Sequence, residues 1–261
     1  MTEKLIRNDK DYIAYLKLND NPANSLSSEM MRAIQAELTE IDTNPSIRVV
    51  VFESANEKIF CSGHSLTEVK GMMNDKNVQA QEKLFAQCSM MMKQIQKISK
   101  PAIAKVRGVA TAAGNQLVAS CDLAYGSEDS RYALPGANIG LFCHTPQVAV
   151  SRTIGRKATM EMLLSGEMID AAKAEKIGLI NKVISSADLD SEVEKVCETI
   201  NQKSAEVIAQ GKRSFYRQIE MGLTDAYAVT SQNMVKNLEL NDANEGISSF
   251  LEKRKPEWTN D

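Results

Sequence analysis

Residues 105–122 have the composition of a short strand that turns directly into a buried helix. Small side chains fill positions 110–114, and a helix is predicted over residues 115–120. The N–H groups that begin such a helix have no partner within it and carry partial positive charge. Small residues let a ligand or another backbone approach closely. This stretch can therefore hold negative charge on a substrate oxygen, although tight packing of a strand against a helix explains the same pattern.

Composition narrows the chemistry that this stretch can serve. The chain has 261 residues, of which 43% are hydrophobic and 25% charged, with a formal net charge of −3. This balance is ordinary for a globular protein and provides no basic field for nucleic acid or for an anionic membrane. The sequence has two histidines, His64 and His144, so a multi-histidine metal site is excluded. No apolar run is long enough to span a membrane.

Five cysteines are scattered through the chain without a C-x-x-C pair. An odd number of cysteines in a chain of this size favours reduced thiols and a cytosolic type of compartment. Residues 1–11 are polar and lack the pattern of a signal or transit peptide. We therefore expect a cytoplasmic protein, or a protein of the mitochondrial matrix if a eukaryotic precursor has been trimmed.

Strands and helices alternate around the central stretch. Hydrophobic periodicity predicts strands at residues 12–19, 47–54, 101–106, 123–127 and 179–184. It predicts helices from Ser25 or Ser27 to about residue 42, and at residues 67–73, 79–99, 147–153, 157–166 and 170–176. Residues 131–136 are predicted to form a turn. Residues 187–250 are amphipathic and helical throughout, so we expect a core of residues 1–190 followed by a helical region, residues 191–261.

Several short motifs occur in a fixed order along the chain. They are Pro22-Ala-Asn-Ser-Leu-Ser, Arg48-Val-Val-Val-Phe, Phe60-Cys-Ser-Gly-His-Ser-Leu, Lys100-Pro-Ala-Ile-Ala, Arg107-Gly-Val-Ala-Thr-Ala-Ala-Gly and Cys121-Asp. Each motif is weak alone, but their order and spacing are specific. In these features the chain resembles the enoyl-CoA hydratase/isomerase (crotonase) superfamily over nearly its whole length.

The resemblance implies an α/β crotonase (ClpP-like) fold, a spiral of ββα units with a C-terminal helical oligomerisation region. It implies a homotrimer or a dimer of trimers, and an acyl-CoA thioester as substrate with no further cofactor. The thioester carbonyl would lie between the backbone N–H groups of His64 and Ala113, which form an oxyanion hole. The coenzyme A would be bordered by Ser62, His64, Leu66, Ala113 and Gly114.

The chain departs from the family pattern at its acid and base. Hydratases of this family use two glutamates to hold a water molecule and move its protons, and these positions fall on Gln116 and Gly136. An amide can hold a water but cannot take its proton at neutral pH, and glycine offers only backbone. General acid–base groups typically contribute roughly 10²–10⁴-fold in rate. We therefore expect weak hydration, or a reaction that uses other groups.

Other residues are candidates for the missing base. His144 lies about where some isomerases and dehalogenases of the superfamily carry an acidic residue, and a histidine can act as base near neutral pH; a histidine held under a loop is the alternative. The His64 side chain could also reach the acyl group. Cys143 is either a nucleophile or a buried thiol. More distant candidates are Asp122, Glu68 and Tyr132.

Three functions follow from these observations. The first is an enzyme that stabilises an acyl-CoA enolate, as a hydratase, isomerase, decarboxylase or thioesterase. The second is a non-catalytic acyl-CoA-binding protein that kept the fold and lost the chemistry, which the residues Gln116 and Gly136 suggest. The third, RNA binding, is opposed by the net charge of −3 and the lack of a basic stripe.

Overall fold

The larger of two sheets contributes alternate side chains to two separate cores. The computed structural model describes residues 3–260. In β3, Val50 and Phe52 enter one core while Val49 and Val51 enter the other, as the two-residue period of a strand requires. The sheet order is β1 (Leu5–Lys10), β2 (Ile13–Leu18), β3 (Val49–Ser54), β5 (Ala102–Val106), β7 (Leu123–Ser127) and β10 (Lys182–Ile184).

The strands of this sheet are parallel except for β1, which pairs antiparallel with β2. All five strands predicted from the sequence occur here, and residues 49–52 are buried on both faces, as expected of a parallel strand. The edge strand β1 was not predicted. Most of its side chains are exposed or only partly buried, so it carries little of the apolar alternation that indicates a strand.

A second sheet brings two short strands against the central helix. Its order is β4 (Ile59–Cys61), β6 (Val109–Thr111), β8 (Arg131–Ala133) and β9 (Ile169–Asp170). The prediction of a turn over residues 131–136 was wrong, because residues 131–133 form β8 and the 3-10 helix η1 (Pro135–Ile139) follows. Strands of two or three residues are too short for their periodicity to distinguish them from turns.

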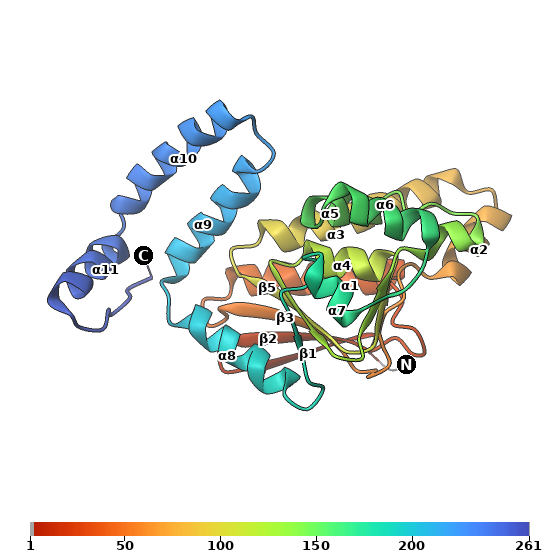
Figure 1. Cartoon of the computed structure of the whole chain (residues 1–261), viewed down its shortest axis with the longest axis horizontal. Helices are drawn as coiled ribbons and strands as arrows, with labels where there is room; N and C mark the ends of the chain where they lie inside the picture. The colour runs from red at the N-terminus through yellow and green to blue at the C-terminus, as the bar shows by residue number, and fades with distance from the viewer. Residues whose placement is uncertain (1–2, 261) are drawn as a thin grey trace.

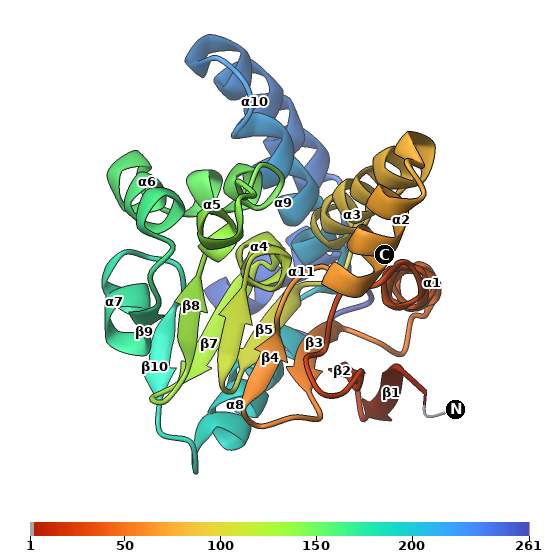
Figure 2. The same ribbon diagram turned by 90° about the vertical axis from the view of Figure 1, so that its right-hand side faces the viewer.

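Helices cover both faces of the larger sheet. The main core contains buried residues of α1 (Ser28–Thr43), α3 (Val78–Lys97) and α4 (Ala113–Ser120), and the second core contains those of α8 (Leu189–Asn201). Ser27 caps α1 by accepting a hydrogen bond from the Met30 N–H at 3.2 Å. Figure 2 shows α4 at the centre of the molecule. The remaining helices of the body are α2 (Leu66–Asn74), α5 (Pro146–Thr153), α6 (Arg156–Ser165) and α7 (Ala171–Lys176).

The last three helices form an arm that projects from the body (Figure 1). They are α9 (Ala205–Gln218), α10 (Leu223–Leu238) and α11 (Asn241–Glu252). The predicted boundary after residue 190 falls inside α8, and Leu189, Val193 and Cys197 of that helix pack in the core of the body. The arm therefore begins after α8. No helix within residues 3–260 combines the length and hydropathy needed to cross a membrane.

A buried lysine joins the arm to the body. Lys212 of α9 is 9% exposed, and its Nζ donates to the carbonyl oxygens of Ile95 and Lys100, both at 2.9 Å. The same ammonium lies 2.7 Å from Asp122 Oδ2, and Tyr216 OH donates to Asp122 Oδ1 at 2.8 Å. Because Asp122 directly follows the C-terminal cap of α4, this contact fixes α9 against the end of the central helix.

We expect Lys212→Met to lower the free energy of unfolding by about 3 kcal/mol, because it leaves a partly buried carboxylate without its cation. The measurement is urea denaturation followed by circular dichroism. The matched control is Lys195→Met, which removes the exposed partner of Glu192 and should leave the urea midpoint unchanged. Equal midpoints for both variants would show that the buried contact does not hold the arm.

Candidate active site

The central helix α4 starts from a strained residue in a buried place. All eight residues of α4 are buried, and its N-terminal cap, Ala112, makes no side-chain capping hydrogen bond. Ala112 has φ 50° and ψ −119°, a conformation that costs a non-glycine residue roughly 1–3 kcal/mol. The Ala112 N–H donates to Ala133 O in β8 at 3.1 Å, which helps to hold this turn. Because Ala112 provides no capping side chain, the first N–H groups of α4 have no capping acceptor.

A second backbone segment lies directly against this helix start. Gly63 has φ +94°, and a Cβ on it would lie 2.9 Å from Ala113 N. A Cβ on Gly114 would lie 2.1 Å from Cys61 O. Both positions therefore require glycine, because the loop after β4 and the first turn of α4 are in backbone contact. His64 directly follows Gly63, so its backbone comes close to this helix start; the pairing of its N–H with that of Ala113 stays a prediction.

Among residues 3–260, these N–H groups lack acceptors. In the described chain, the N–H groups of His64, Ala113 and Gly114 make no hydrogen bond to another residue. Buried backbone donors without a partner are rare because each costs free energy to desolvate. In the same turn, both side-chain amide atoms of Asn115 are buried and unpartnered among residues 3–260. The start of α4 thus presents donors that a ligand oxygen can satisfy.

The Gln116 side chain lies inside the protein and faces α3. It is 4% exposed, and its Oε1 lies 3.8 Å from Cys88 Sγ, which donates to it. Burial raises the pKa of the Cys88 thiol to about 12, so this group stays protonated at neutral pH. Gln116 can position a polar ligand atom, but neither its amide nor the thiol beside it is a base at neutral pH.

The position of Gly136 has no room for a side chain. A Cβ there would lie 2.6 Å from Leu141 O and 3.0 Å from Cys143 Sγ. Gly136 comes three residues after Ala133, which accepts the Ala112 N–H, so this filled space lies close to the start of α4. Cys143 is 6% exposed, and burial raises the pKa of its thiol. A buried thiol therefore occupies space that a carboxylate would need.

The other predicted acid–base candidates lie apart from the helix start or are already engaged. The His144 side chain is exposed, and its ring lies 5.3 Å from that of Phe142. Tyr132 is fully buried, and its hydroxyl lies 3.1 Å from Ser130 Oγ. Asp122 is engaged by Lys212. The roles predicted for these residues stay predictions, but none is an unpartnered buried base.

The residues expected to border coenzyme A flank the glycine turn. The Ser62 N–H donates to Ala23 O at 3.1 Å, and the Ser62 carbonyl accepts from Thr111 Oγ1 at 3.1 Å. Its backbone is therefore already fixed within the protein. Leu66 begins α2 and is 56% exposed, so its side chain is available to a ligand at the edge of the site.

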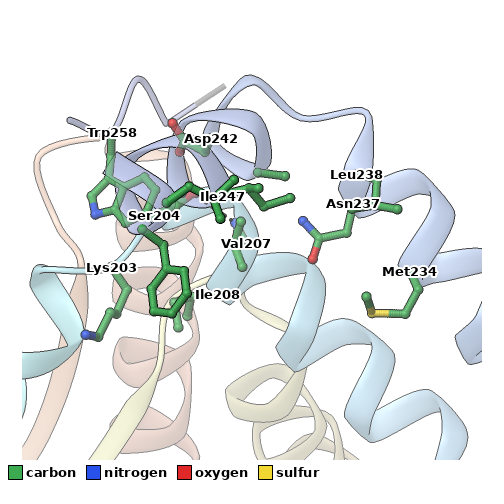
Figure 3. A pocket seen from close by; sticks show the side chains of 14 residues that line it. Lys203, Ser204, Val207, Ile208, Met234, Asn237, Leu238, Asp242, Ile247 and Trp258 are labelled. Carbon is green, nitrogen blue, oxygen red and sulfur yellow. Dashed lines mark hydrogen bonds between the residues drawn. The ribbon is translucent and has the colours of Figure 1, made fainter. Parts of the chain in front are cut away.

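A groove of about 660 Å³ lies elsewhere, among the helices of the arm (Figure 3). Its walls are largely apolar and include Val207, Ile247 and Trp258. The carboxylate of Asp242, at its edge, accepts hydrogen bonds from the N–H groups of Thr259 and Asn260 at 2.7 and 3.0 Å. The carboxylate of Asp242 in this groove is engaged by these hydrogen bonds, so the start of α4 remains the candidate site.

The fold and the helix start together match one known family. A family model described as enoyl-CoA hydratase/isomerase matches residues 8–261. The chain belongs to the enoyl-CoA hydratase/isomerase family. It is 44% identical over 241 residues to the mitochondrial enoyl-CoA hydratase domain-containing protein 3 of Xenopus laevis, covering 92% of this chain and 81% of that protein. The human protein of that name is 41% identical, and the match covers 93% of this chain and 79% of the human protein.

Solved structures of the family confirm the crotonase fold predicted from the sequence. The crystal structure of human enoyl Coenzyme A hydratase domain-containing protein 3 superimposes with a TM-score of 0.94 at 39% identity, covering 98% of this chain and all of that chain. The crystal structure of an enoyl-CoA hydratase from Mycobacterium smegmatis superimposes with a TM-score of 0.93 at 43% identity, covering 98% of this chain and 99% of that chain. The similarity includes the arm, since nearly the whole chain is covered.

Sequence reasoning missed two features of this family member. The first is the strained backbone of Ala112. A positive φ cannot be predicted there, because alanine, unlike glycine or asparagine, is not typical of that conformation. The second is the filled space at Gly136, since Cys143 is seven residues away in the sequence. The Phe-Cys-His segment over residues 142–144 did carry a signal, namely a thiol and an imidazole side by side, but the two point into different surroundings.

We expect Gly136→Ala to lower the free energy of unfolding by about 1–3 kcal/mol, because its Cβ would overlap the Leu141 carbonyl. The control is Gly71→Ala in α2, where a Cβ meets nothing within 4 Å and an alanine favours the helix. Thermal unfolding of both variants measures the difference. A Gly136→Ala variant as stable as Gly71→Ala would show that this position can accept a side chain.

Proposed function

We propose that this protein is an acyl-CoA enzyme that polarises a thioester carbonyl and stabilises the enolate formed from it. The observation that carries the proposal is the pair of N–H groups of His64 and Ala113, which lack acceptors in the described chain; Ala113 is fully buried and directly follows the strained Ala112. Backbone strain and unsatisfied donors both cost free energy, and in folded proteins they occur mainly at sites that bind a ligand. The family to which the chain belongs makes an acyl-CoA thioester the ligand expected there.

The chemistry follows from the position of these donors. When a proton leaves the carbon next to a thioester, negative charge gathers on the carbonyl oxygen. Two fixed N–H groups in a water-poor site stabilise that charge without reorganising. Removing one such donor costs roughly 3–4 kcal/mol of transition-state stabilisation in other enzymes. The hole alone therefore favours any reaction that proceeds through the enolate.

Hydration is the family reaction that these residues support least. It needs a group that deprotonates water and a group that protonates carbon, and Gln116 and Gly136 supply neither. We therefore propose enolate chemistry that needs a single base, such as isomerisation, ahead of hydration. The second candidate function is acyl-CoA binding without turnover, which the same two residues favour.

We further propose that the chain assembles as a homotrimer or a dimer of trimers through its arm. Large apolar side chains on the arm are exposed in the single chain, among them Phe250 at 82%, Leu223 at 76% and Leu251 at 73%. Exposed patches of this kind mark association surfaces, and light scattering of the purified protein distinguishes three subunits from six. The Xenopus and human relatives are named as mitochondrial proteins, which supports the matrix among the compartments expected.

Acetoacetyl-CoA tests the hole without requiring turnover. Its enolate absorbs in the near ultraviolet, and a hole that favours negative charge lowers the pKa of the bound ligand. We expect the wild-type protein to raise the enolate fraction at neutral pH, and free coenzyme A to reverse the change by competition. Unaltered enolate absorbance in the presence of saturating protein would contradict the proposal.

The matched variants for this test are Gly63→Ala and Gly178→Ala. Both glycines have positive φ, +94° and +83°, so alanine bears a similar backbone cost at each. A Cβ at Gly63 would lie 2.9 Å from Ala113 N, whereas one at Gly178 meets nothing within 4 Å. We expect the enolate signal to disappear in Gly63→Ala and to remain in Gly178→Ala.

Hydration of crotonyl-CoA separates the enolate proposal from a standard hydratase. We expect slow hydration by the wild-type protein, and less than about a tenfold gain in Gln116→Glu, because the second carboxylate position is filled by Cys143. Loss of the conjugated-thioester absorbance measures the rate. A gain of about 100-fold or more from Gln116→Glu alone would show that one carboxylate is sufficient here.

A further inference from the structure

We propose that the imidazole of His64 is the base that removes a proton from the carbon next to the thioester, so that His64 serves the reaction with both its backbone N–H and its ring. This inference rests on the proposed function and names the group that makes the enolate. It explains how an enolate site can work although Gln116 and Gly136 have replaced both carboxylates.

A backbone carbonyl fixes the tautomer of the His64 ring. Nδ1 lies 3.3 Å from Leu26 O, and because a carbonyl oxygen can only accept, the proton is on Nδ1. The lone pair of the neutral ring is then on Nε2. Nε2 is buried and has no hydrogen-bond partner within residues 3–260. A buried, unpartnered nitrogen lone pair next to the start of α4 is the arrangement that a general base requires.

The His64 ring packs against the face of α3 that also contacts Gln116. The ring packs edge-to-face on Phe85 of α3, with centroids 5.3 Å apart. Cys88 lies three residues further along α3, on the same face of the helix, and its thiol donates to Gln116 Oε1. Thus His64, Phe85 and Gln116 surround one region beside the start of α4. A thioester whose oxygen meets the His64 N–H has its neighbouring carbon within the same region.

The other titratable groups near the ring are not free to act as base. Glu68 of α2 accepts hydrogen bonds from the Ser28 N–H at 3.0 Å and from Ser28 Oγ at 2.5 Å, so its carboxylate is committed to the start of α1. Burial raises the pKa of the Cys61 and Cys88 thiols to about 12. Phe85 from α3 and Leu26 from the segment before α1 contribute no charge. His64 is therefore the one neutral base among these groups.

The proton-transfer step balances within the site. Nε2 takes the proton from the carbon next to the thioester, and the electrons of the C–H bond form the carbon–carbon double bond of the enolate. The electrons of the carbonyl double bond move to oxygen, which the two N–H groups hold. In an acyl chain with a double bond between its β and γ carbons, return of the proton to the γ carbon moves that double bond to the α,β position and completes an isomerisation; its return to the α carbon of any acyl chain produces exchange with solvent. No further reactant is required.

The pH dependence follows from the burial of the ring. Burial lowers the pKa of His64 from 6.5, opposed by the Leu26 carbonyl and the charge of Glu68, which raise it. The free ring is therefore neutral at pH 7 and remains so somewhat below pH 6.5. Activity that depends on the neutral ring should be constant near pH 7 and fall only when the pH drops through this lowered pKa.

Deuterium exchange into butyryl-CoA tests the assignment without knowledge of the natural substrate. The protein is incubated with butyryl-CoA in deuterated buffer, and mass spectrometry follows deuterium uptake next to the thioester. We expect exchange by the wild-type protein and a loss of about 100-fold or more in His64→Gln, which keeps the backbone N–H but not the base. The rate should fall at a pH below 6.5.

His144→Gln is the decisive comparison, because it removes the other histidine of the chain. Loss of exchange in His144→Gln with retention in His64→Gln would overturn the inference and assign the base to His144. Exchange by His64→Gln at the wild-type rate would also overturn it.

Acetoacetyl-CoA distinguishes a failure of this inference from a failure of the proposed function. The enolate fraction of bound acetoacetyl-CoA reports on the hole of the wild-type protein, and circular dichroism establishes that His64→Gln is folded. If the wild-type protein forms this enolate but exchanges no butyryl-CoA protons, the proposed oxyanion hole is supported and the assignment of His64 as base is wrong. If it does neither, the proposed function is wrong as well.

Discussion

The first turn of α4 is the constraint on which the rest of the structure depends. Its first two N–H groups, those of Ala113 and Gly114, belong to buried residues and lack acceptors in the described chain, and Ala112 before them has a strained backbone. Such a turn persists only where the surroundings over-determine it. Here β8 accepts the Ala112 N–H, and the backbone of Cys61 fills the space beside Gly114. Both sheets are needed for this, because α4 connects a strand of the small sheet to one of the large sheet.

Three glycines around this turn show which parts of the family site were retained. Gly63 and Gly114 allow two backbones to touch, and any side chain there would break the hole. Gly136 differs, because the room for its missing side chain is taken by the Leu141 carbonyl and the Cys143 thiol. The positions at which the resemblance places the acid and base therefore carry no carboxylate, and part of the space at Gly136 is filled, whereas the turn proposed as the hole persists with a strained backbone. This contrast favours a reaction that needs the hole and a different proton acceptor.

The sequence predicted the parts of the molecule that depend on periodicity. Long apolar alternation located α1, α3 and the buried strands, and the small residues over 110–114 located the turn into α4. It could not predict β8 or β9, whose two or three residues pair through tertiary contacts rather than local preference. It also could not predict that Cys143 fills the space at Gly136, or that Leu26 fixes the tautomer of His64. Each of these contacts joins residues whose approach the fold alone decides.

The proposed location of the oxyanion hole and the base on one residue has an electrostatic consequence. When Nε2 of His64 takes a proton, the ring becomes positive at the moment the thioester oxygen becomes negative, and both charges lie in a buried region. Opposite charges attract strongly where water does not screen them. Burial lowers the pKa of His64 in the free protein, but the enolate would raise it again by favouring the charged ring. The same burial that keeps the ring neutral before reaction thus strengthens the ion pair that forms during it.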